Sequence, residues 1–247
     1  MFVEHLSDLR WTSPDHFNSI LMAFQREAIN NTEALTTLRT SLQVLDLAET
    51  TEIFSRTLGL TRDQITGKKI LFEYDPESDV DRILKTLVGE TASNLEKTIL
   101  FTRTDGVASS LGRNEPGLKV LLLTTRVSKM TLEDDNLVLL PAYETSLILD
   151  SIDKTIRTYA AAPFTIIFDN ITHMIFMIGQ ERTFNLVRQA LELMPSESIT
   201  AVFLLNIKAH DQKIISDFES LFDVEIQFKA GARIPEIRTK MKVQTQA

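Results

Sequence analysis

Apolar positions follow two different patterns along the 247-residue chain, and the change falls near residue 66. Up to that point they recur at helical spacing, and neither Gly nor Pro interrupts the stretch between Pro14 and Gly59. Beyond it, short apolar runs alternate with amphipathic stretches, as strands and helices do in a parallel α/β sheet. We therefore predict an N-terminal helical segment over residues 1–66 and an α/β domain over residues 67–247.

The N-terminal segment carries a repeat that is typical of packed helices. Ser13 and Pro14 form a helix start, in which a capping hydroxyl precedes proline at the first helical position. Alternating steps of four and three residues connect Phe17, Leu21, Phe24, Ala28, Asn31, Leu35, Leu38, Leu42 and Leu45. This period predicts either a dimerising coiled coil with Asn31 at a core position, or an antiparallel hairpin that turns at residues 30–32. Both interpretations make the segment an interaction element.

Residues 53–65 have the outline of a helix-turn-helix core, because a helical stretch, a turn with Gly59 and a second helix start follow one another. Thr61 and Gln64 have the spacing of a capping box. Gly67 and the strand that follows it leave little length for a recognition helix. We expect a connector helix here and keep DNA reading as an alternative.

The α/β domain alternates predicted strands and helices. Strands are predicted at residues 69–74, 98–102, 118–124, 136–140, 164–168, 200–205, 224–228 and 236–243. Helices are predicted at residues 79–89, 146–159, 182–194 and 214–221. Phe164–Phe168 has no polar alternation, which favours a strand buried on both faces. We predict the α/β class, with a mainly parallel sheet and helices on both of its faces.

Composition narrows the classes of function. The net charge of −8 argues against attraction of the whole protein to DNA or to anionic membranes. The absence of cysteine excludes disulfides and thiol chemistry, and it fits a reducing cytoplasm. No apolar run approaches the ~20 residues that span a bilayer. We expect a cytoplasmic protein with no membrane segment, no metal site and no nucleic-acid partner.

The α/β domain resembles the RecA-type ATPase core, and more narrowly its KaiC-like branch, which is common in archaea. The resemblance rests on three stretches: TIIFDNITHMIFM at residues 165–177, LLNIKAHDQKIISDFESLFDVEIQF at residues 204–228 and GARIPEIRTKMKV at residues 231–243. It extends over roughly residues 67–243 and implies a RecA-like sheet. It also implies that Asp169 is a Walker B residue, which helps to hold the metal of a bound nucleotide.

Two contacts with other chains are expected from this resemblance and from the distribution of charge. The family's terminal strand often reaches the nucleotide of a neighbouring subunit, and here it carries Arg238, Lys240 and Lys242. We expect these cations to touch the acidic loop 75–79 of a second copy. The apolar run Met174–Ile178 has two interpretations, either core or a contact with a subunit or partner.

The loop after the first strand departs from the family. There the family has G-x-x-x-x-G-K-[ST], whose glycines let backbone N–H groups wrap the phosphates and whose Lys meets the outer phosphates. Residues 73–79 contain neither Gly nor Lys, and their four acidic side chains would repel a polyphosphate. The family's catalytic Glu normally ends the second strand, whereas this chain has Asp105 there, which is shorter and offset along the sequence. The predicted degenerate nucleotide site comprises Asp75, Glu77, Ser78, Asp79, Asp105 and Asp169.

These observations favour a non-catalytic, pseudo-ATPase protein that regulates or scaffolds through contacts with a protein partner or a second copy, without a cofactor. A first alternative is an ATPase that binds ATP and Mg²⁺ through an atypical loop, with Asp169 and with Lys240 and Lys242 from another chain. A second alternative is a recombinase-like or helix-turn-helix regulator that binds DNA. The sequence names neither the partner nor the pathway.

Overall fold

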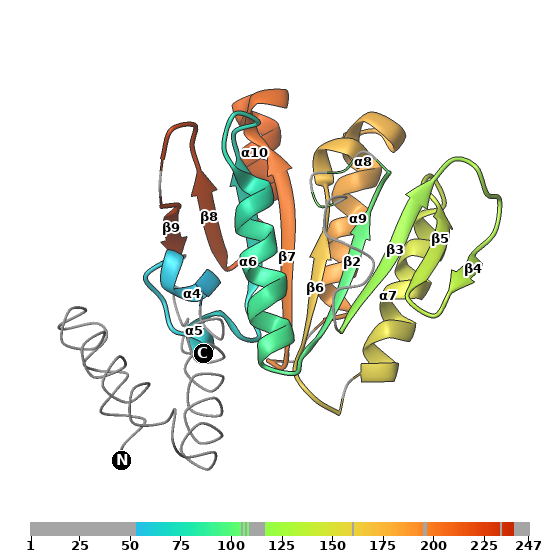
Figure 1. Ribbon diagram of the computed structural model, residues 1–247. Helices are drawn as coiled ribbons and strands as arrows, with labels where there is room; N and C mark the ends of the chain where they lie inside the picture. Colours follow the sequence, from blue (N-terminus) through green and yellow to red (C-terminus); the bar gives the residue numbers. More distant parts are fainter. Residues whose placement is uncertain are drawn as a thin grey trace, which may run out of the picture. The chain divides into compact units, whose positions relative to one another are not determined.

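The computed structural model describes residues 53–104, 106, 108, 117–159, 161–194, 197–232 and 234–239 (Figure 1). The chain divides into two compact units, residues 1–51 and residues 52–247. The predicted coiled coil or hairpin, with its repeat from Phe17 to Leu42, lies outside the described residues. The second unit contains the whole sheet.

Within the described residues, nine strands form one sheet in the order β4-β5-β3-β2-β6-β7-β1-β8-β9. Only the two edge strands, β4 and β9, are antiparallel to their neighbours. The strands are β1 Lys69–Tyr74, β2 Lys97–Thr102, β3 Leu118–Thr124, β4 Thr131–Asp134, β5 Leu137–Pro141, β6 Phe164–Phe168, β7 Ile199–Asn206, β8 Val224–Phe228 and β9 Glu236–Thr239.

Helices cover both faces of this sheet, which confirms the predicted fold class. They are α4 Ile53–Thr57, α5 Arg62–Ile65, α6 Val80–Ser93, α7 Thr145–Tyr159, α8 Ile171–Ile178, α9 Gln180–Glu192 and α10 Gln212–Glu219, with a 3-10 turn at Ile207–Ala209. Buried side chains of α4, α5 and α6 share one apolar cluster, and those of α7 to α10 share another. Figure 1 shows α6 in front of the sheet and α7 and α9 behind it.

Strand β6 is central to the core, as its sequence predicts. All five of its residues are buried, and it pairs in parallel with β2 and β7. On one face, Phe168 stacks against Phe101 and Phe203, with ring centroids 5.7 and 5.4 Å apart. Because both faces of β6 are covered, an uninterrupted apolar run suits it better than an alternating one.

Two elements differ from the sequence-based expectation. Strand β4 is not marked by an apolar run, since Leu132 is 65% exposed and its neighbours are polar. It is specified by its antiparallel pairing with β5. The apolar run Met174–Ile178 belongs to helix α8, which begins at the capping residue Asn170. Met174 is buried, which fits the core interpretation, whereas Phe176 is 70% exposed. The contact with a subunit or partner stays a prediction.

Residues 53–66 pack with the α/β unit, although the predicted domain boundary grouped them with the N-terminal segment. Phe54 of α4 and Ile65 of α5 are buried in the cluster that contains α6. Helix α5 is one turn long and has two buried residues, which is the form of a connector. None of the described helices combines the length and apolar character needed to cross a membrane.

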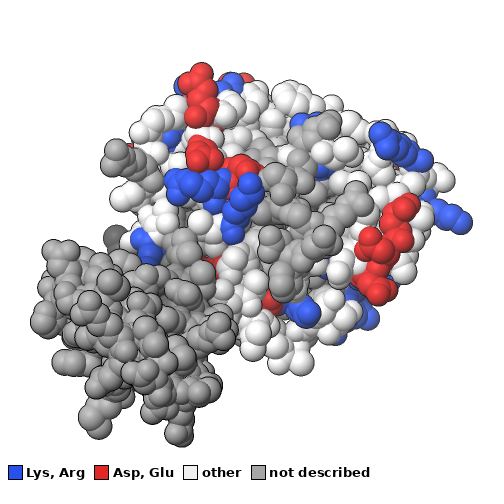
Figure 2. All heavy atoms as spheres, viewed as in Figure 1, with Lys and Arg blue, Asp and Glu red and all other residues white. Residues whose placement is uncertain are grey.

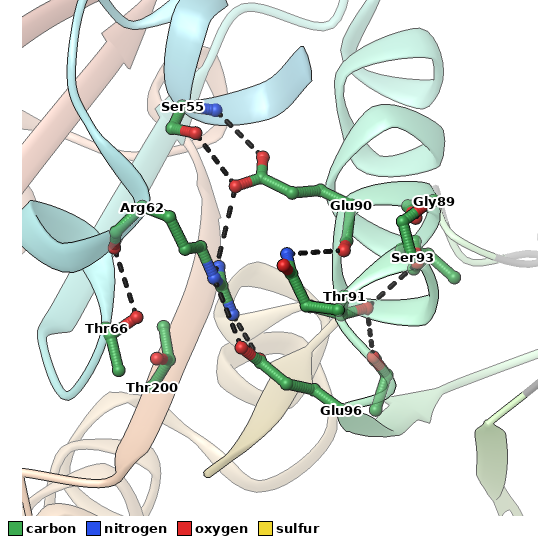
Figure 3. Close-up of polar contacts among 12 residues, drawn as sticks. Ser55, Arg62, Thr66, Gly89, Glu90, Thr91, Ser93, Glu96 and Thr200 are labelled. Atoms are coloured by element: carbon green, nitrogen blue, oxygen red, sulfur yellow. Dashed lines mark hydrogen bonds and ion pairs between the residues drawn. The ribbon is translucent and has the colours of Figure 1, made fainter. Parts of the chain in front are cut away.

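A buried polar network attaches this connector to α6 (Figure 3). Ser55 donates to the Glu90 carboxylate through its backbone N–H at 2.9 Å and its hydroxyl at 2.8 Å. The Arg62 guanidinium lies 3.9 Å from the same carboxylate and also pairs with Glu96. Glu90 is fully buried, so these partners compensate its desolvation.

Candidate functional site

The carboxyl ends of β1, β6 and β7 meet at one edge of the sheet, where open α/β proteins bind ligands. Residues 75–79 connect β1 to α6 and form a compact turn. The Asp75 carboxylate accepts a hydrogen bond from Glu77 N at 3.0 Å, and its carbonyl accepts from Ser78 N at 2.8 Å. The Asp79 carboxylate accepts from Arg82 N at 3.4 Å and pairs with the Arg82 side chain at 3.2 Å.

A cation that the sequence analysis missed faces this turn. Lys208 follows β7, and its ammonium lies 3.5 Å from the carboxylate of the nearly buried Asp75. The Asn206 side chain accepts from Lys208 N at 2.9 Å and thereby shapes the turn that presents this lysine. The loops after β1 and β7 are thus joined by an ion pair.

Asp169 lies at the end of β6 and is 1% exposed. Its Oδ2 atom accepts hydrogen bonds from the Thr102 hydroxyl at 2.8 Å and from Ala108 N at 2.7 Å. Gly106 packs closely here, because a Cβ at this position would lie 2.3 Å from both Asp169 Oδ2 and Thr102 Oγ1. Thr102, Gly106 and Ala108 therefore lie directly against this carboxylate.

The next residue, Asn170, connects β6 to β1. Its amide donates to the Tyr74 hydroxyl at 3.1 Å, and its side-chain oxygen accepts from His173 N at 2.7 Å as the cap of α8. Burial raises the pKa of Tyr74, and the nearby Asp169 charge raises this pKa further. The phenol is therefore neutral and serves as a hydrogen-bonding group.

A second set of contacts joins α8 to the loop after β7. The Thr172 hydroxyl accepts from Asn206 N at 3.0 Å and lies 3.0 Å from His210 Nε2. Burial lowers the pKa of His210. The His210 ring also lies against the exposed Phe176 ring, with centroids 5.8 Å apart. Together these groups form what we call the carboxyl-edge cluster: Tyr74, Asp75, Thr102, Asp169, Asn170, Thr172, Lys208 and His210.

Glu73 is the first acid of the stretch 73–79 that we predicted to repel a polyphosphate. It is the second-last residue of β1 and is fully buried. Burial raises its pKa to about 7, and the carboxylates of Glu219 and Glu225 add to this increase. Gln227 donates to Glu73 at 3.1 Å and accepts from Arg238 at 3.3 Å. Glu73 is thus grouped with α10 and β8, apart from the turn at residues 75–79.

The predicted site residues are only partly brought together. Asp75 and Asp79 shape the turn after β1, Ser78 donates its hydroxyl to the Asp75 carbonyl at 2.6 Å, and Glu77 is exposed. Asp105, Lys240 and Lys242 lie outside the described residues. Across the part of the chain that is described, no group of three or more His, Cys, Asp or Glu side chains has the geometry of a metal site.

Sequence reasoning missed the polar partners of the cluster: Tyr74, Thr102, Asn170, Thr172, Lys208 and His210. One signal was available for Asn170, since an Asx residue before a helical run is a typical cap. The other residues have no distinctive sequence pattern around them, and their roles are visible only from their contacts with residues of other strands and loops.

Residues 128–236 match the model of DUF7090, a family of unknown function, which is less than half of the chain. No curated protein matches the sequence. A solved structure from Pyrococcus horikoshii OT3, described as a structural study of project PH0250, is similar with a TM-score of 0.49 and 12% identity, over 72% of this chain and 89% of that chain. The KaiC-like protein PH0186 from the same hyperthermophilic archaeon has a TM-score of 0.48 and 12% identity, over 72% and 82% of the two chains.

Proposed function

We propose that this protein is a RecA/KaiC-like domain that works without nucleotide turnover, as a regulatory or scaffolding unit that binds a protein partner or a second copy. One observation carries the proposal. The turn at residues 75–79, where a phosphate loop would follow β1, is acidic and is held closed by its own hydrogen bonds and by Lys208.

The donor set at this edge does not fit the phosphates of a nucleotide. Phosphate loops present several backbone N–H groups and a lysine, whereas Ser78 N and Glu77 N are both directed to atoms of Asp75. An added phosphate would also meet the charges of Asp75, Glu77 and Asp79. Each like-charge pair at 4 Å costs about 1 kcal/mol in water and about 4 kcal/mol in a partly buried setting.

Asp169 is likewise engaged in the fold. An Asp that holds a magnesium ion through Walker B chemistry needs accessible oxygens, but Asp169 is 1% exposed and its Oδ2 already accepts two short hydrogen bonds. We assign it a structural role, in which it fixes Ala108 and the end of β2.

The surface supports protein binding better than nucleic-acid binding. Figure 2 shows acidic and basic side chains next to one another on the face that carries α6. There Lys85 pairs with Asp81 at 2.9 Å and Arg82 pairs with Asp79. A DNA-binding face needs a continuous basic tract, which paired charges do not provide. Phe176, 70% exposed beside His210, gives the carboxyl edge an apolar contact point.

The proposal is tested by titrating the purified full chain with Mg-ATP in a calorimeter, together with a thermal-shift measurement. We expect neither heat of binding nor a change in Tm at millimolar nucleotide. Binding in the micromolar range would contradict the proposal. The partner contact is tested by the oligomer mass and by affinity capture with Phe176→Ser, which should lose a partner that the wild type retains. Leu95→Ser is the control, because Leu95 is 92% exposed in the turn between α6 and β2.

A second candidate function is nucleotide binding with an atypical loop, and Lys208 is the observation that favours it. Its side chain is 66% exposed and lies at the carboxyl edge. Lys208→Met separates the two functions: it should leave a protein-binding activity unchanged and should abolish nucleotide binding if this lysine meets phosphate. Lys229→Met is a matched control, since Lys229 pairs with Glu236 between β8 and β9.

A further inference from the structure

A groove lies near the amino ends of the outer strands β3 and β5, between these strands, β4 and the C-terminal half of α7. Figure 1 shows α7 behind β3 and β5, with β4 at the edge. The groove has a volume of about 390 Å³ and is lined by Lys119, Leu121, Met130, Leu132, Val138, Ser151, Lys154, Thr155, Thr158 and Tyr159. Lys119 and Val138 are each second in their strand, so the groove adjoins the amino ends of β3 and β5 and is separate from the carboxyl-edge cluster.

One side of the groove is apolar and incompletely covered. Leu121 and Val138 are 4% and 8% exposed and belong to the core. Met130 and Leu132, from β4 and the residue before it, are 43% and 65% exposed. A pair of exposed large apolar side chains beside a concave surface is a place where an apolar ligand removes area from water.

Lys119 is the residue of β3 that lines the groove and carries an ammonium group. It shares a face of β3 with Leu121, because side chains two residues apart in a strand point to the same side. It is half-buried, and no carboxylate of the described residues lies within ion-pair distance of it. By contrast, Lys154 on the rim already pairs with Asp150 at 2.7 Å. A lysine on the helix-covered face of a sheet without an acid beside it is suited to an external anion.

Thr155 adds a hydroxyl from the facing helix. Two neighbours on α7 direct their hydroxyls to helix carbonyls, Ser151 to Leu147 O at 2.7 Å and Thr158 to Lys154 O at 2.8 Å. Thr155 is 8% exposed and has no such bond among the described residues. Its hydroxyl is therefore available to a group bound in the groove.

We propose that the groove binds a small amphiphilic carboxylate, with its apolar chain against Leu121, Val138 and Leu132 and its carboxylate at Lys119 and Thr155. The volume lies within the range of small-ligand sites. One ammonium and one hydroxyl match a single carboxylate head, whereas phosphate sites gather arginines or successive backbone N–H groups. This site is independent of the function proposed for the carboxyl edge.

The test uses the full chain, with decanoate as the probe and calorimetry as the measurement. We expect saturable binding of decanoate, and a dissociation constant raised about tenfold or more in Lys119→Met, which keeps the apolar stem but removes the charge. Lys97→Met is the control, because Lys97 is exposed at the start of β2 and does not line the groove. Binding of decanol, which lacks the charge, should be weak and equal in all three proteins.

A second variant checks the apolar wall. Leu132→Asp alters a side chain that is largely exposed, so the fold should persist, and it should also weaken decanoate binding at least as strongly as Lys119→Met. The proposal is overturned if decanoate does not bind below its aggregation concentration, if Lys119→Met binds it like the wild type, or if Lys97→Met weakens it equally. Equal affinity for decanol and decanoate in the wild type would remove the anionic head from the assignment.

Discussion

The carboxyl-edge cluster and the α7 groove differ in whether their polar side chains have partners within the protein. At the carboxyl edge, Asp75 pairs with Lys208, and Asp169 accepts from Thr102 and Ala108. In the groove, Lys119 and Thr155 have no partner among the described residues. The polar groups at the carboxyl edge are paired with one another, whereas the groove, which no sequence motif marks, has a cation and a hydroxyl without a partner in the described chain. Whether a site can bind a ligand therefore depends on whether its polar groups already have hydrogen-bond or ion-pair partners, and not on whether it lies where related folds have a binding loop.

The largest expected effect is the loss of the carboxylate that closes the edge. Asp169→Ala leaves the Thr102 hydroxyl and the Ala108 N–H buried without an acceptor, so the free energy of unfolding should fall by about 2–4 kcal/mol. Urea denaturation measures this change, with the exposed Asp63→Ala as control. Lys119→Met in the groove should change stability by less than about 0.5 kcal/mol. Equal losses of stability at the two sites would contradict the difference that we describe between paired and unpaired polar groups.

A steric version of the same test uses two glycines. Gly106→Ala places a Cβ 2.3 Å from Asp169 Oδ2 and Thr102 Oγ1, so these buried side chains or the backbone must shift, and the unfolding free energy should fall by about 1–3 kcal/mol. Gly89→Ala is the matched control on α6, where no atom lies within 4 Å of the added Cβ. There alanine should raise stability by about 0.5–1 kcal/mol through helix propensity. Thermal unfolding of the two variants gives opposite shifts in Tm if Gly106 packs against Asp169 as described.

The buried Glu73 carboxyl provides a pH-dependent contrast with the paired acids of the edge. Because its pKa is raised from the ordinary 4.5 to about 7, the folded protein holds a proton that the unfolded chain has released between these pH values. The stabilisation is complete below about pH 4.5 and is lost as the pH rises through 7. Wild type should therefore be less stable at pH 8 than at pH 5.5, by on the order of 2 kcal/mol.

Glu73→Gln should remove most of this pH dependence and should be more stable than the wild type at pH 8. The groups that face Glu73 are Glu219 of α10 with Glu225 and Gln227 of β8, and they remain in the variant. Glu77→Gln, in the exposed turn that follows, serves as the control and should keep the wild-type profile. A wild-type stability that rises steadily from pH 5.5 to pH 8 would contradict the assignment.

The smallest expected effect concerns self-association. If the basic terminal strand touches the acidic turn of a second copy, reversing Lys240 and Lys242 to Glu should lower the oligomer mass measured by light scattering. Stability should change by less than about 0.5 kcal/mol. Arg238 is excluded from this test, because it bonds to Gln227 within its own sheet. An unchanged mass would limit partner contacts to other surfaces, such as Phe176.

Local pattern determined much of the fold by itself. The strands β1, β3, β6 and β8 have the bounds that their apolar runs predict, because a strand covered by helices requires continuous burial whatever its neighbours are. The alternation of these runs with amphipathic stretches was sufficient for the α/β class. The absence of Gly and Lys after β1 is likewise a fact of sequence, and it underlies the proposed loss of nucleotide chemistry.

Only the tertiary structure decided what the polar residues do. Asp169 meets Thr102 and Ala108 from 67 and 61 residues away, and Asp75 meets Lys208 only because β1 and β7 lie side by side. Strand β4 is defined by its pairing with β5. The groove beside it lies between α7 and the outer strands. Periodicity records which side chains are buried, but the partner of a buried or half-buried polar group is set by strand order, which no local pattern encodes.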